Sequence, residues 1–306
     1  MNHQIGEMGT TLYVDDDNTL GPWDGTLLHP YRYIQDGVDN ATDGDTVFVF
    51  NGTYNKYHPE YVAIVYIYNK RLDVVGENKN TTIVDGDFNF HVFRIYGDNT
   101  TIRGFTIQNS KDRPQAAGII LRGNDIEITD TIIRQNNNGI EVYGLRNKIH
   151  NNTIVNNTGD NGFGLMITDW SIDPTKDNIV IHNQFLENKI GILVSGERCT
   201  DNRFSNNLFK DNRVGIEADD CFNNNYLRNS FITNTNHFQF YGTFPLFLLN
   251  FRGQNVWDEN YWDNWPFLMP KPIQAFRVIW WPPFFVLPIP MLRFDWHPAQ
   301  EPFDIG

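Results

Sequence analysis

Two stretches of the chain carry the same pattern, residues 178–194 (NIVIHNQFLENKIGILV) and residues 202–218 (NRFSNNLFKDNRVGIEA). Each reads Asn-x-φ, then Asn-x-φ-x-x-Asn, then Gly-φ-x-φ, where φ is an apolar residue. Residues 147–167 carry a third copy, and fainter copies precede and follow it. The first apolar positions of the five copies are 21, 31, 24 and 23 residues apart, at Ile128, Ile149, Val180, Phe204 and Leu227. Such spacing is typical of a repeat protein whose units stack on one another.

The pattern predicts an all-β fold, a single-stranded right-handed parallel β-helix with three short strands in each coil. Strands that pair with the coils above and below place equivalent residues in vertical columns. Apolar columns would fill the interior, and asparagines would occupy the corners, where they tolerate left-handed backbone and can bond from coil to coil. A leucine-rich repeat is the obvious rival, but its Leu-dominated consensus is absent. The expected asparagine columns are 147, 178, 202, 225; 152, 183, 207; and 136, 157, 188, 212.

The two ends of the chain depart from the repeat. Residues 29–41 read as a short amphipathic helix that would cap the open end of the stack. Beyond residue 244 the period fades into an aromatic and proline-rich tail, a suitable cover for the last coil. We expect one structural domain with four parts: an unstructured start (1–11), an N-terminal cap with the first coils (12–98), regular β-helix repeats (99–244) and a C-terminal cap and tail (245–306).

Composition limits the classes of function. The formal net charge is -13, and no cluster of Lys and Arg appears, which disfavours nucleic acid as a partner. The longest apolar run has 15 residues and contains four prolines, so no transmembrane segment is expected. Residues 1–11 lack the apolar part of a signal peptide, so either that peptide was removed or the protein is cytosolic. Six N-glycosylation sequons favour removal and an extracellular or cell-surface location: Asn40, Asn51, Asn80, Asn99, Asn151, Asn156.

The sequence resembles the pectate-lyase-like β-helix superfamily, and within it the parallel β-helix repeat proteins called carbohydrate-binding and sugar-hydrolase domains. The asparagine repeats carry this resemblance, together with an opening Tyr-Val-Asp-Asp-Asp-Asn at 13–18 and a closing Asn-Tyr-Trp-Asp at 260–263. It covers roughly residues 11 to 265 and is strongest to archaeal surface members. The same repeat family includes a periplasmic protein linked to copper-site assembly in nitrous oxide reductase clusters. Copper prefers closely spaced His, Met or Cys, whereas the five Met and eight His of this chain are scattered.

The resemblance implies that a ligand would lie along outward positions of one sheet. The Gly-φ-x-φ strand sets the register, because the second and fourth residues after the glycine point outward. One outward column is then Ile120, Glu141, Met166, Leu193, Glu217 and Phe240, and the other is Arg122, Tyr143, Thr168, Ser195 and Asp219. Three coils separate Glu141 from Glu217, about 14 Å, which is too far for the carboxyl pair of a glycosidase.

Two groups on this face are candidate site residues. Glu217, Asp219 and Asp220 would lie close together, where they could act in acid catalysis, bind Ca²⁺ or simply form a solvated acidic edge. Trp170 and Tyr143 could form an aromatic platform for sugar rings, with Asp169, Glu141 and Arg122 as polar neighbours. A loop tryptophan that packs back on its own coil is the alternative.

Cys199 and Cys221 lie one coil apart, so adjacent columns would bring them within reach of a disulfide; stacked free thiols are the alternative. No cofactor is required by any motif, and Ca²⁺ is the one ion that the acidic residues suggest. Three functions remain open: a non-catalytic protein that binds carbohydrate or surface polymers, a polysaccharide lyase or glycoside hydrolase, and a structural protein that forms homo-oligomers through its C-terminal tail.

Overall fold

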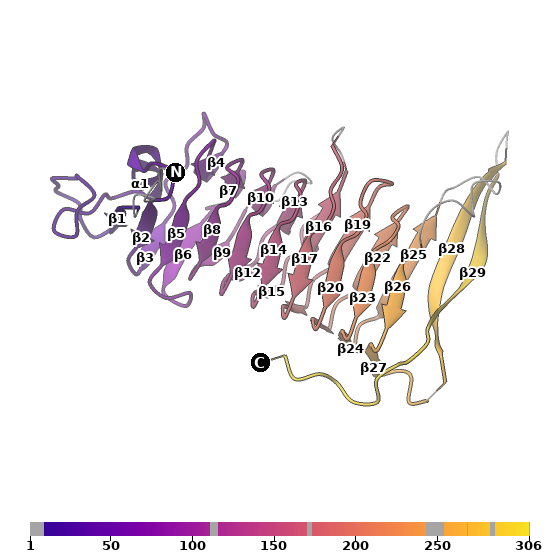
Figure 1. The fold of residues 1–306 in the computed structure, drawn as a ribbon. Coiled ribbons are helices and arrows are strands. Elements are labelled where there is room, and N and C mark those ends of the chain that lie inside the picture. The colour runs from indigo at the N-terminus through magenta and orange to yellow at the C-terminus, as the bar shows by residue number, and fades with distance from the viewer. Residues whose placement is uncertain are drawn as a thin grey trace, which may run out of the picture.

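The computed structural model describes residues 9–110, 116–169, 173–242, 254–267, 269–281 and 285–305. The chain winds into a right-handed parallel β-helix whose coils contribute strands to three long sheets, here called A, B and C (Figure 1). The predicted fold class is confirmed. A leucine-rich repeat is excluded by the same topology, because all three sheets run the length of the stack.

Sheet A has ten strands in the order of the coils. They are β1 (Thr11–Val14), β2 (Thr46–Val49), β5 (Asp73–Gly76), β8 (Thr101–Arg103), β11 (Glu127–Thr129), β14 (Lys148–His150), β17 (Ile179–Ile181), β20 (Arg203–Ser205), β23 (Asn225–Leu227) and β26 (Val256–Asp258).

Sheet B follows sheet A in each coil and has nine strands. They are β3 (Gly52–Tyr54), β6 (Thr82–Asp85), β9 (Thr106–Gln108), β12 (Ile132–Arg134), β15 (Thr153–Val155), β18 (Gln184–Leu186), β21 (Leu208–Lys210), β24 (Ser230–Ile232) and β27 (Tyr261–Trp262).

Sheet C completes each coil with a longer strand. Its members are β4 (Ala63–Ile67), β7 (His91–Ile95), β10 (Ala117–Leu121), β13 (Asn138–Val142), β16 (Phe163–Thr168), β19 (Ile190–Ser195), β22 (Val214–Asp219), β25 (Asn236–Gly242), β28 (Lys271–Trp281) and β29 (Phe285–Asp295). The first nine run parallel, and β29 pairs with β28 in the opposite direction.

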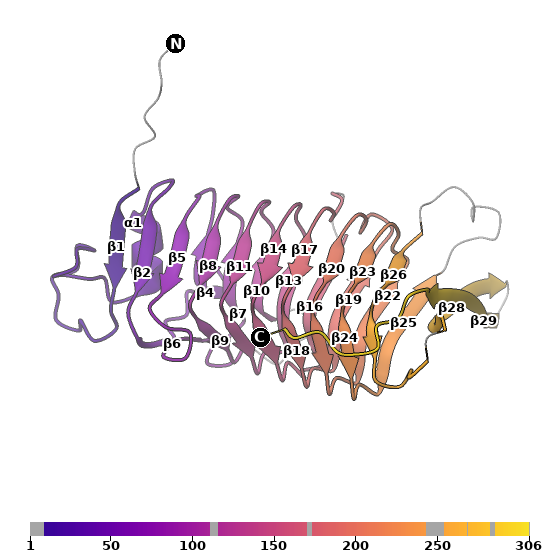
Figure 2. The ribbon, with the colours of Figure 1, turned by 60° about the horizontal axis from the view of Figure 1, so that its bottom comes forward.

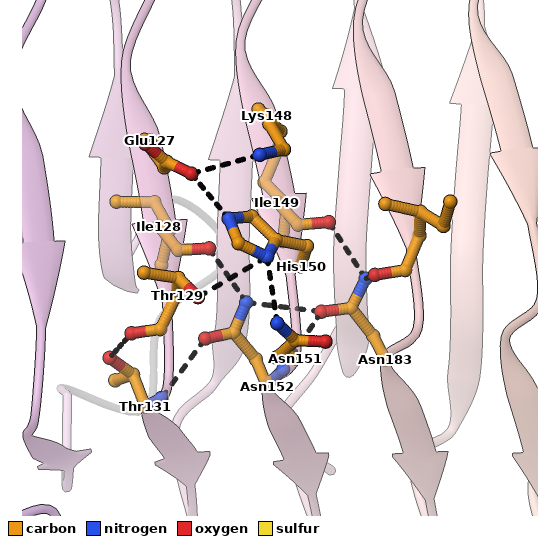
Figure 3. A network of polar contacts seen from close by, with 11 residues as sticks. Glu127, Ile128, Thr129, Thr131, Lys148, Ile149, His150, Asn151, Asn152 and Asn183 are labelled. Carbon is orange, nitrogen blue, oxygen red and sulfur yellow. Dashed lines mark hydrogen bonds and ion pairs between the residues drawn. The ribbon is translucent and has the colours of Figure 1, made fainter. Parts of the chain in front are cut away.

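Buried asparagines connect successive coils at the corners. Asn183 shows the arrangement: its Oδ1 accepts from the backbone N–H and the amide of Asn152, and its own amide donates to the Ile149 carbonyl (Figure 3). The same amide donates to Asn207 Oδ1 in the next coil. A backbone N–H left without a partner in the interior would cost about 1 to 3 kcal/mol, so each asparagine replaces water at a turn that the strands cannot satisfy. The same pattern holds at the other two corners.

The predicted alignment of the coil at residues 224–227 with the preceding coil is wrong by one residue. Asn202 donates to Asn224, not to Asn225, and Tyr226 rather than Leu227 takes the inward apolar position beside Phe204. Three consecutive asparagines at 223–225 made these alternatives indistinguishable in the sequence. The column then continues to Asn255.

The interior changes from aliphatic to aromatic along the stack. Phe185, Phe209, Phe231 and Trp262 stack ring upon ring, with centroid distances of 5.0, 4.9 and 4.4 Å. These rings occupy equivalent inward positions of sheet B and are fully or almost fully buried. Rings that stack from one coil to the next stabilise the fold beyond the effect of burying them.

Glycines at the start of the sheet C strands allow the coils to approach closely. A Cβ on Gly191 would lie 2.4 Å from the carbonyl oxygen of Gly215, and a Cβ on Gly215 would lie 2.4 Å from that of His237. His237 occupies the equivalent place in β25, which pairs with the long strand β28. Sheets A and B continue for one more coil, with β26 and β27, before the hairpin of β28 and β29.

The N-terminal helix α1 is shorter than expected, Ile34–Asn40 instead of 29–41. Tyr31 lies before it and pairs with Val14 as an isolated bridge, and its carbonyl accepts from Asp15 N–H. This pairing holds the segment extended up to the first helical turn. Ile34 and Val38 of the helix are buried, and α1 contacts β1, β2 and β4 at the N-terminal end of the stack (Figure 1).

The C-terminal segment does more than cover the last coil. Strands β28 and β29 form a long hairpin that extends sheet C, and the last residues run back along the stack (Figure 2). Asp295, at the end of β29, is buried and accepts from the backbone and amide of Asn260, so it closes one asparagine column with a carboxylate. The described part of the chain contains no helix long and apolar enough to span a membrane.

Candidate functional site

The outer face of sheet C presents two columns of side chains, largely as the repeat predicted. The first column runs Tyr66, Arg94, Ile120, Glu141, Met166, Leu193, Glu217 and Gln239. Phe240 was expected here but pairs with the inward Ala218 and is buried, because His237 and not Phe238 occupies the glycine position. The second column includes Thr168, Ser195, Asp219 and Tyr241 in register.

Aromatic and cationic side chains gather at the N-terminal end of this face. We call Tyr66, Tyr68, Arg94, Tyr96 and Arg122 the tyrosine–arginine cluster. The rings of Tyr66 and Tyr68 stack with centroids 5.9 Å apart, and Tyr96 lies 5.6 Å from Tyr66 and 6.3 Å from Tyr68. Arg94 Nη2 donates to the Tyr96 hydroxyl over 2.6 Å, and its guanidinium lies 5.3 Å from the Tyr96 ring. The cluster is thus held by both stacking and cation–π contacts.

Arg122 joins this cluster to Glu141 and Tyr143. Its guanidinium lies 5.8 Å from the Tyr96 ring and 4.8 Å from the Tyr143 ring. Glu141 accepts hydrogen bonds from Tyr143 Oη over 2.7 Å and from Asn138 Nδ2 over 2.8 Å. Burial raises the pKa of Glu141, although these bonds and Arg122 oppose the shift. Three of the predicted ligand-binding residues, Arg122, Glu141 and Tyr143, therefore lie together.

The side chains of the tyrosine–arginine cluster and its neighbours differ in solvent exposure. Glu141 and Tyr143 are only 3% and 8% exposed, whereas Tyr68 is 55% exposed. Burial raises the pKa of Tyr143 far above its usual range, as does the adjacent Glu141 carboxylate. Tyr143 is therefore buried against Glu141 and does not form an exposed platform, whereas the ring of Tyr68 is open to solvent.

A hollow of about 410 Å³ adjoins the cluster beyond the ends of the sheet C strands, and Tyr96 forms part of both. Lys70 in this hollow is fixed, because its ammonium donates to the carbonyls of Val38 and Asp39. The lining mixes cationic, anionic and amide groups: Asp43, Asn69, Lys70, Arg71, Tyr96, Asp98 and Asn99. Such a mixture can meet hydroxyl, carboxylate or amine groups of a ligand.

The acidic residues lie at the other end of the same face. Glu217 and Asp219 are alternate residues of β22, on its outer side, and Asp220 follows the strand with a left-handed φ of 48°. Burial, with Asp220 and Glu217 nearby, raises the pKa of Asp219 to about 6. Burial also raises the pKa of Glu217, against the effect of Arg213. Three coil steps separate Glu217 from Glu141, as expected, so the two do not form a carboxyl pair.

Asp169, another predicted ligand-binding residue, follows the sheet C strand β16. Asp169 Oδ2 accepts from the backbone N–H of Arg198 over 3.0 Å and faces the guanidinium Nε at 3.4 Å. This contact ties the loops of adjacent coils together, which is a structural role. Trp170 lies outside the described residues.

The disulfide that the one-coil spacing of the cysteines allowed is not formed. Cys199 and Cys221 are free, buried thiols. They do stand in neighbouring coils, since the next residues, Thr200 and Phe222, form a parallel bridge. Parallel in-register side chains point the same way, however, and the sulfur of Cys199 lies 3.1 Å from the Ser195 carbonyl while that of Cys221 lies 3.9 Å from Tyr226 Oη. The alternative of stacked thiols is the one observed.

Over the described ranges, no group of three or more His, Cys, Asp or Glu side chains is placed to hold a metal ion. Glu217, Asp219 and Asp220 are therefore not brought together as a Ca²⁺ site. Several histidines each pair with one carboxylate, as His237 does with Asp263 at 2.7 Å. His150 contacts Glu127 on the outer face of sheet A (Figure 3).

The sequence did not indicate most of the tyrosine–arginine cluster. The first coils lack the Asn and Gly markers that aligned the later repeats, so Tyr66 and Tyr68 could not be placed above Arg94 and Tyr96. The one available signal was the alternation of Tyr66, Ile67 and Tyr68, which places both tyrosines on one side of a strand.

Several solved structures share this fold. A pectate lyase (Pel9A) has a TM-score of 0.60 and 14% sequence identity over 83% of this chain and 74% of that chain. The alginate lyase AlyGC of family PL6 has a TM-score of 0.55 and 17% identity over 74% of this chain, which spans only 33% of that enzyme. ORF18 of Geobacillus virus E2 has a TM-score of 0.51 and 14% identity, over 88% of this chain and 61% of that chain. These identities show the fold alone.

A search of curated proteins found no match. A family model does match the sequence: the model described as "Periplasmic copper-binding protein (NosD)" covers residues 38–265. That range extends from helix α1 through the regular coils to the residues that follow β27. The chain therefore belongs to the NosD family.

Proposed function

We propose that this protein is an extracytoplasmic β-helix that binds carbohydrate or a related surface polymer at the tyrosine–arginine cluster on sheet C. The family description names the periplasm, and the sequons of the sequence also favour a location outside the cytoplasm. The solved relatives in fold include enzymes that act on polysaccharides, which makes a polymer ligand a reasonable first class to test.

The observation that carries the proposal is the stack of tyrosine rings held by arginines. Sugar rings present apolar C–H faces that pack on aromatic side chains, and hydroxyl groups that accept from guanidinium donors. Tyr68 is the exposed ring of the stack, and the hydrogen bond from Arg94 to Tyr96 fixes the rest in place. Because these contacts already order the rings without a ligand, less conformational entropy is lost on binding.

The description of the family names copper binding, but the described residues do not fit a copper centre. Copper prefers closely spaced His, Met or Cys ligands. Cys199 and Cys221 lie in neighbouring coils, but both thiols are buried, and burial raises the pKa of both, that of Cys221 to about 12. The metal-binding thiolate is therefore disfavoured. No step of the proposed function uses copper.

The test is binding of the purified protein to a glycan array, followed by titration of the best ligand. Tyr68→Ala should weaken binding at least tenfold, because it removes the exposed ring and leaves the buried support intact. Trp296→Ala is the matched control, since Trp296 is 61% exposed and lies outside sheet C. Equal affinity of the wild type and Tyr68→Ala would remove the proposed site.

A second candidate function is glycan cleavage at the acidic end of the face, favoured by one observation. Asp219 has a pKa raised to about 6, so it could carry a proton near neutral pH, as a general acid must. Glu217 is two residues away in the same strand, roughly 7 Å at the backbone, which suits a pair of carboxyl groups.

An activity screen over neutral and uronic-acid polymers, with and without Ca²⁺, tests this second candidate. Product formation that is lost in Asp219→Asn and Glu217→Gln would support catalysis. No product from any polymer in the panel would contradict it, while leaving the binding proposal to be judged by the glycan array.

A further inference from the structure

A second hollow lies at the opposite edge of sheet C, at the corner where sheet B ends. Its volume is about 390 Å³, within the range of sites that bind small ligands. It crosses several coils, because its lining comes from the segments that follow β6, β9, β12 and β15. The described residues that line it carry no formal charge: Phe88, Asn109, Ser110, Gln135, Asn136, Asn137, Asn156, Thr158 and Gly159.

Phe88 is exposed at this hollow, on a turn that hydrogen bonds to Asp85 hold in place. Its side chain is 64% exposed, and its backbone has a left-handed φ of 53°, which a bulky residue rarely adopts. Asp85 fixes the turn: its carboxylate accepts from Asp87 N–H over 2.9 Å, from Gln108 Nε2 over 2.6 Å and from Asn109 Nδ2 over 2.9 Å. These hydrogen bonds hold the turn that keeps the Phe88 ring exposed at the hollow.

The polar part of the lining combines a fixed floor with accessible groups. Ser110 is buried and accepts from Asn137 N–H over 3.0 Å, and Asn136 belongs to a corner column, so both hold the floor in place. Gln135 and Thr158 are exposed at the rim. Amide and hydroxyl groups both donate and accept, which matches the hydroxyl groups of a sugar.

We propose that this hollow binds a neutral saccharide, with the Phe88 ring packed on a sugar face and Gln135 and Thr158 bonded to its hydroxyls. A carboxylated sugar would find no cation among the described lining residues and would be repelled by a chain of net charge -13. The site is separate from the tyrosine–arginine cluster, because it lies before the sheet C strands and the cluster lies along them and at their ends. It therefore does not depend on the function proposed there.

The test is calorimetric titration with neutral oligosaccharides, namely cello-, xylo- and malto-oligomers, and with oligogalacturonate for comparison. The protein should be produced without N-glycans, because Asn156 in the lining begins a sequon. We expect the wild type to bind a neutral oligomer and to bind it in preference to oligogalacturonate. Phe88→Ala should weaken that binding at least tenfold, while Phe88→Tyr should retain it.

Two further variants test whether the oligomer binds at the Phe88 hollow or elsewhere. Phe267→Ala is the control for loss of an exposed phenyl ring, since Phe267 is 52% exposed elsewhere in the chain, and it should bind like the wild type. Tyr68→Ala should also bind like the wild type. The inference is overturned if no neutral oligomer binds, if Phe88→Ala binds as well as the wild type, or if Tyr68→Ala alone removes the binding. A matching urea midpoint for each variant checks that it is folded.

Discussion

The corner and interior columns of this β-helix contrast with the outer face of sheet C. Asparagine follows asparagine at the corners, and apolar residue follows apolar residue inside, because each coil must satisfy the same backbone groups and fill the same volume. On the outer face the same backbone carries tyrosine and arginine at one end and carboxylates at the other. The first region builds the scaffold, and the second is free to vary its chemistry.

This division predicts that interior substitutions change stability and leave ligand binding unchanged. The largest expected effect is that of Phe209→Ala, which removes a ring stacked between Phe185 and Phe231. The free energy of unfolding should fall by about 3 to 5 kcal/mol. Lys210→Ala is the control, because Lys210 is the exposed neighbour in β21, and it should change stability by less than about 0.5 kcal/mol. Urea denaturation measures both, and equal effects would contradict the assigned interior.

The next effect separates the two sequence neighbours at the corrected register. Asn224→Ala removes the acceptor of the backbone N–H and amide of Asn202, so the free energy of unfolding should fall by about 1 to 3 kcal/mol. Asn225→Ala should have almost no effect, because Asn225 lies partly exposed in β23, outside the column. Thermal or urea denaturation of the two variants tests the register. A larger loss in Asn225→Ala than in Asn224→Ala would place Asn225, and not Asn224, in the column.

The smallest effect is a pH dependence on the outer face. The folded state raises the pKa of Asp219 from 3.8 to about 6, so folding favours its protonated form. The stabilisation from that proton is complete below about pH 4 and disappears as the pH rises towards 6. Relative to Asp219→Asn, the wild type should therefore lose stability across this window, by less than about 1 kcal/mol because the side chain is partly solvated. Parallel curves of melting temperature against pH for the two proteins would contradict the shift.

The sequence predicted the repeating region well because the constraints there recur in every coil. Asn152, Asn183 and Asn207 were placed in one column from their spacing alone, and the structure confirms that placement. The prediction slipped by one residue at 224–225, where neighbouring asparagines gave the same pattern. It placed Phe240 on the wrong face because His237 replaces the marker glycine.

The site was less accessible to sequence reasoning, for a physical reason. Outer positions have no packing or hydrogen-bonding requirement in common, so nothing in their residue types repeats from coil to coil. Arg122, Glu141 and Tyr143 were found because they follow a marker glycine or its equivalent, and they do lie together. Tyr68 and Phe88 were missed, since each lies in an early coil without such markers. The side-chain direction that prevented the disulfide also needed coordinates.

The central claim is that the variable outer face binds the ligand while the repeated columns only support it. The most direct measurement is the affinity of one glycan, taken from the array, for the wild type, Tyr68→Ala and Asn224→Ala under conditions where all three are folded. The account predicts at least tenfold weaker binding for Tyr68→Ala and wild-type affinity for Asn224→Ala. Wild-type affinity in Tyr68→Ala, together with a loss in Asn224→Ala, would contradict it.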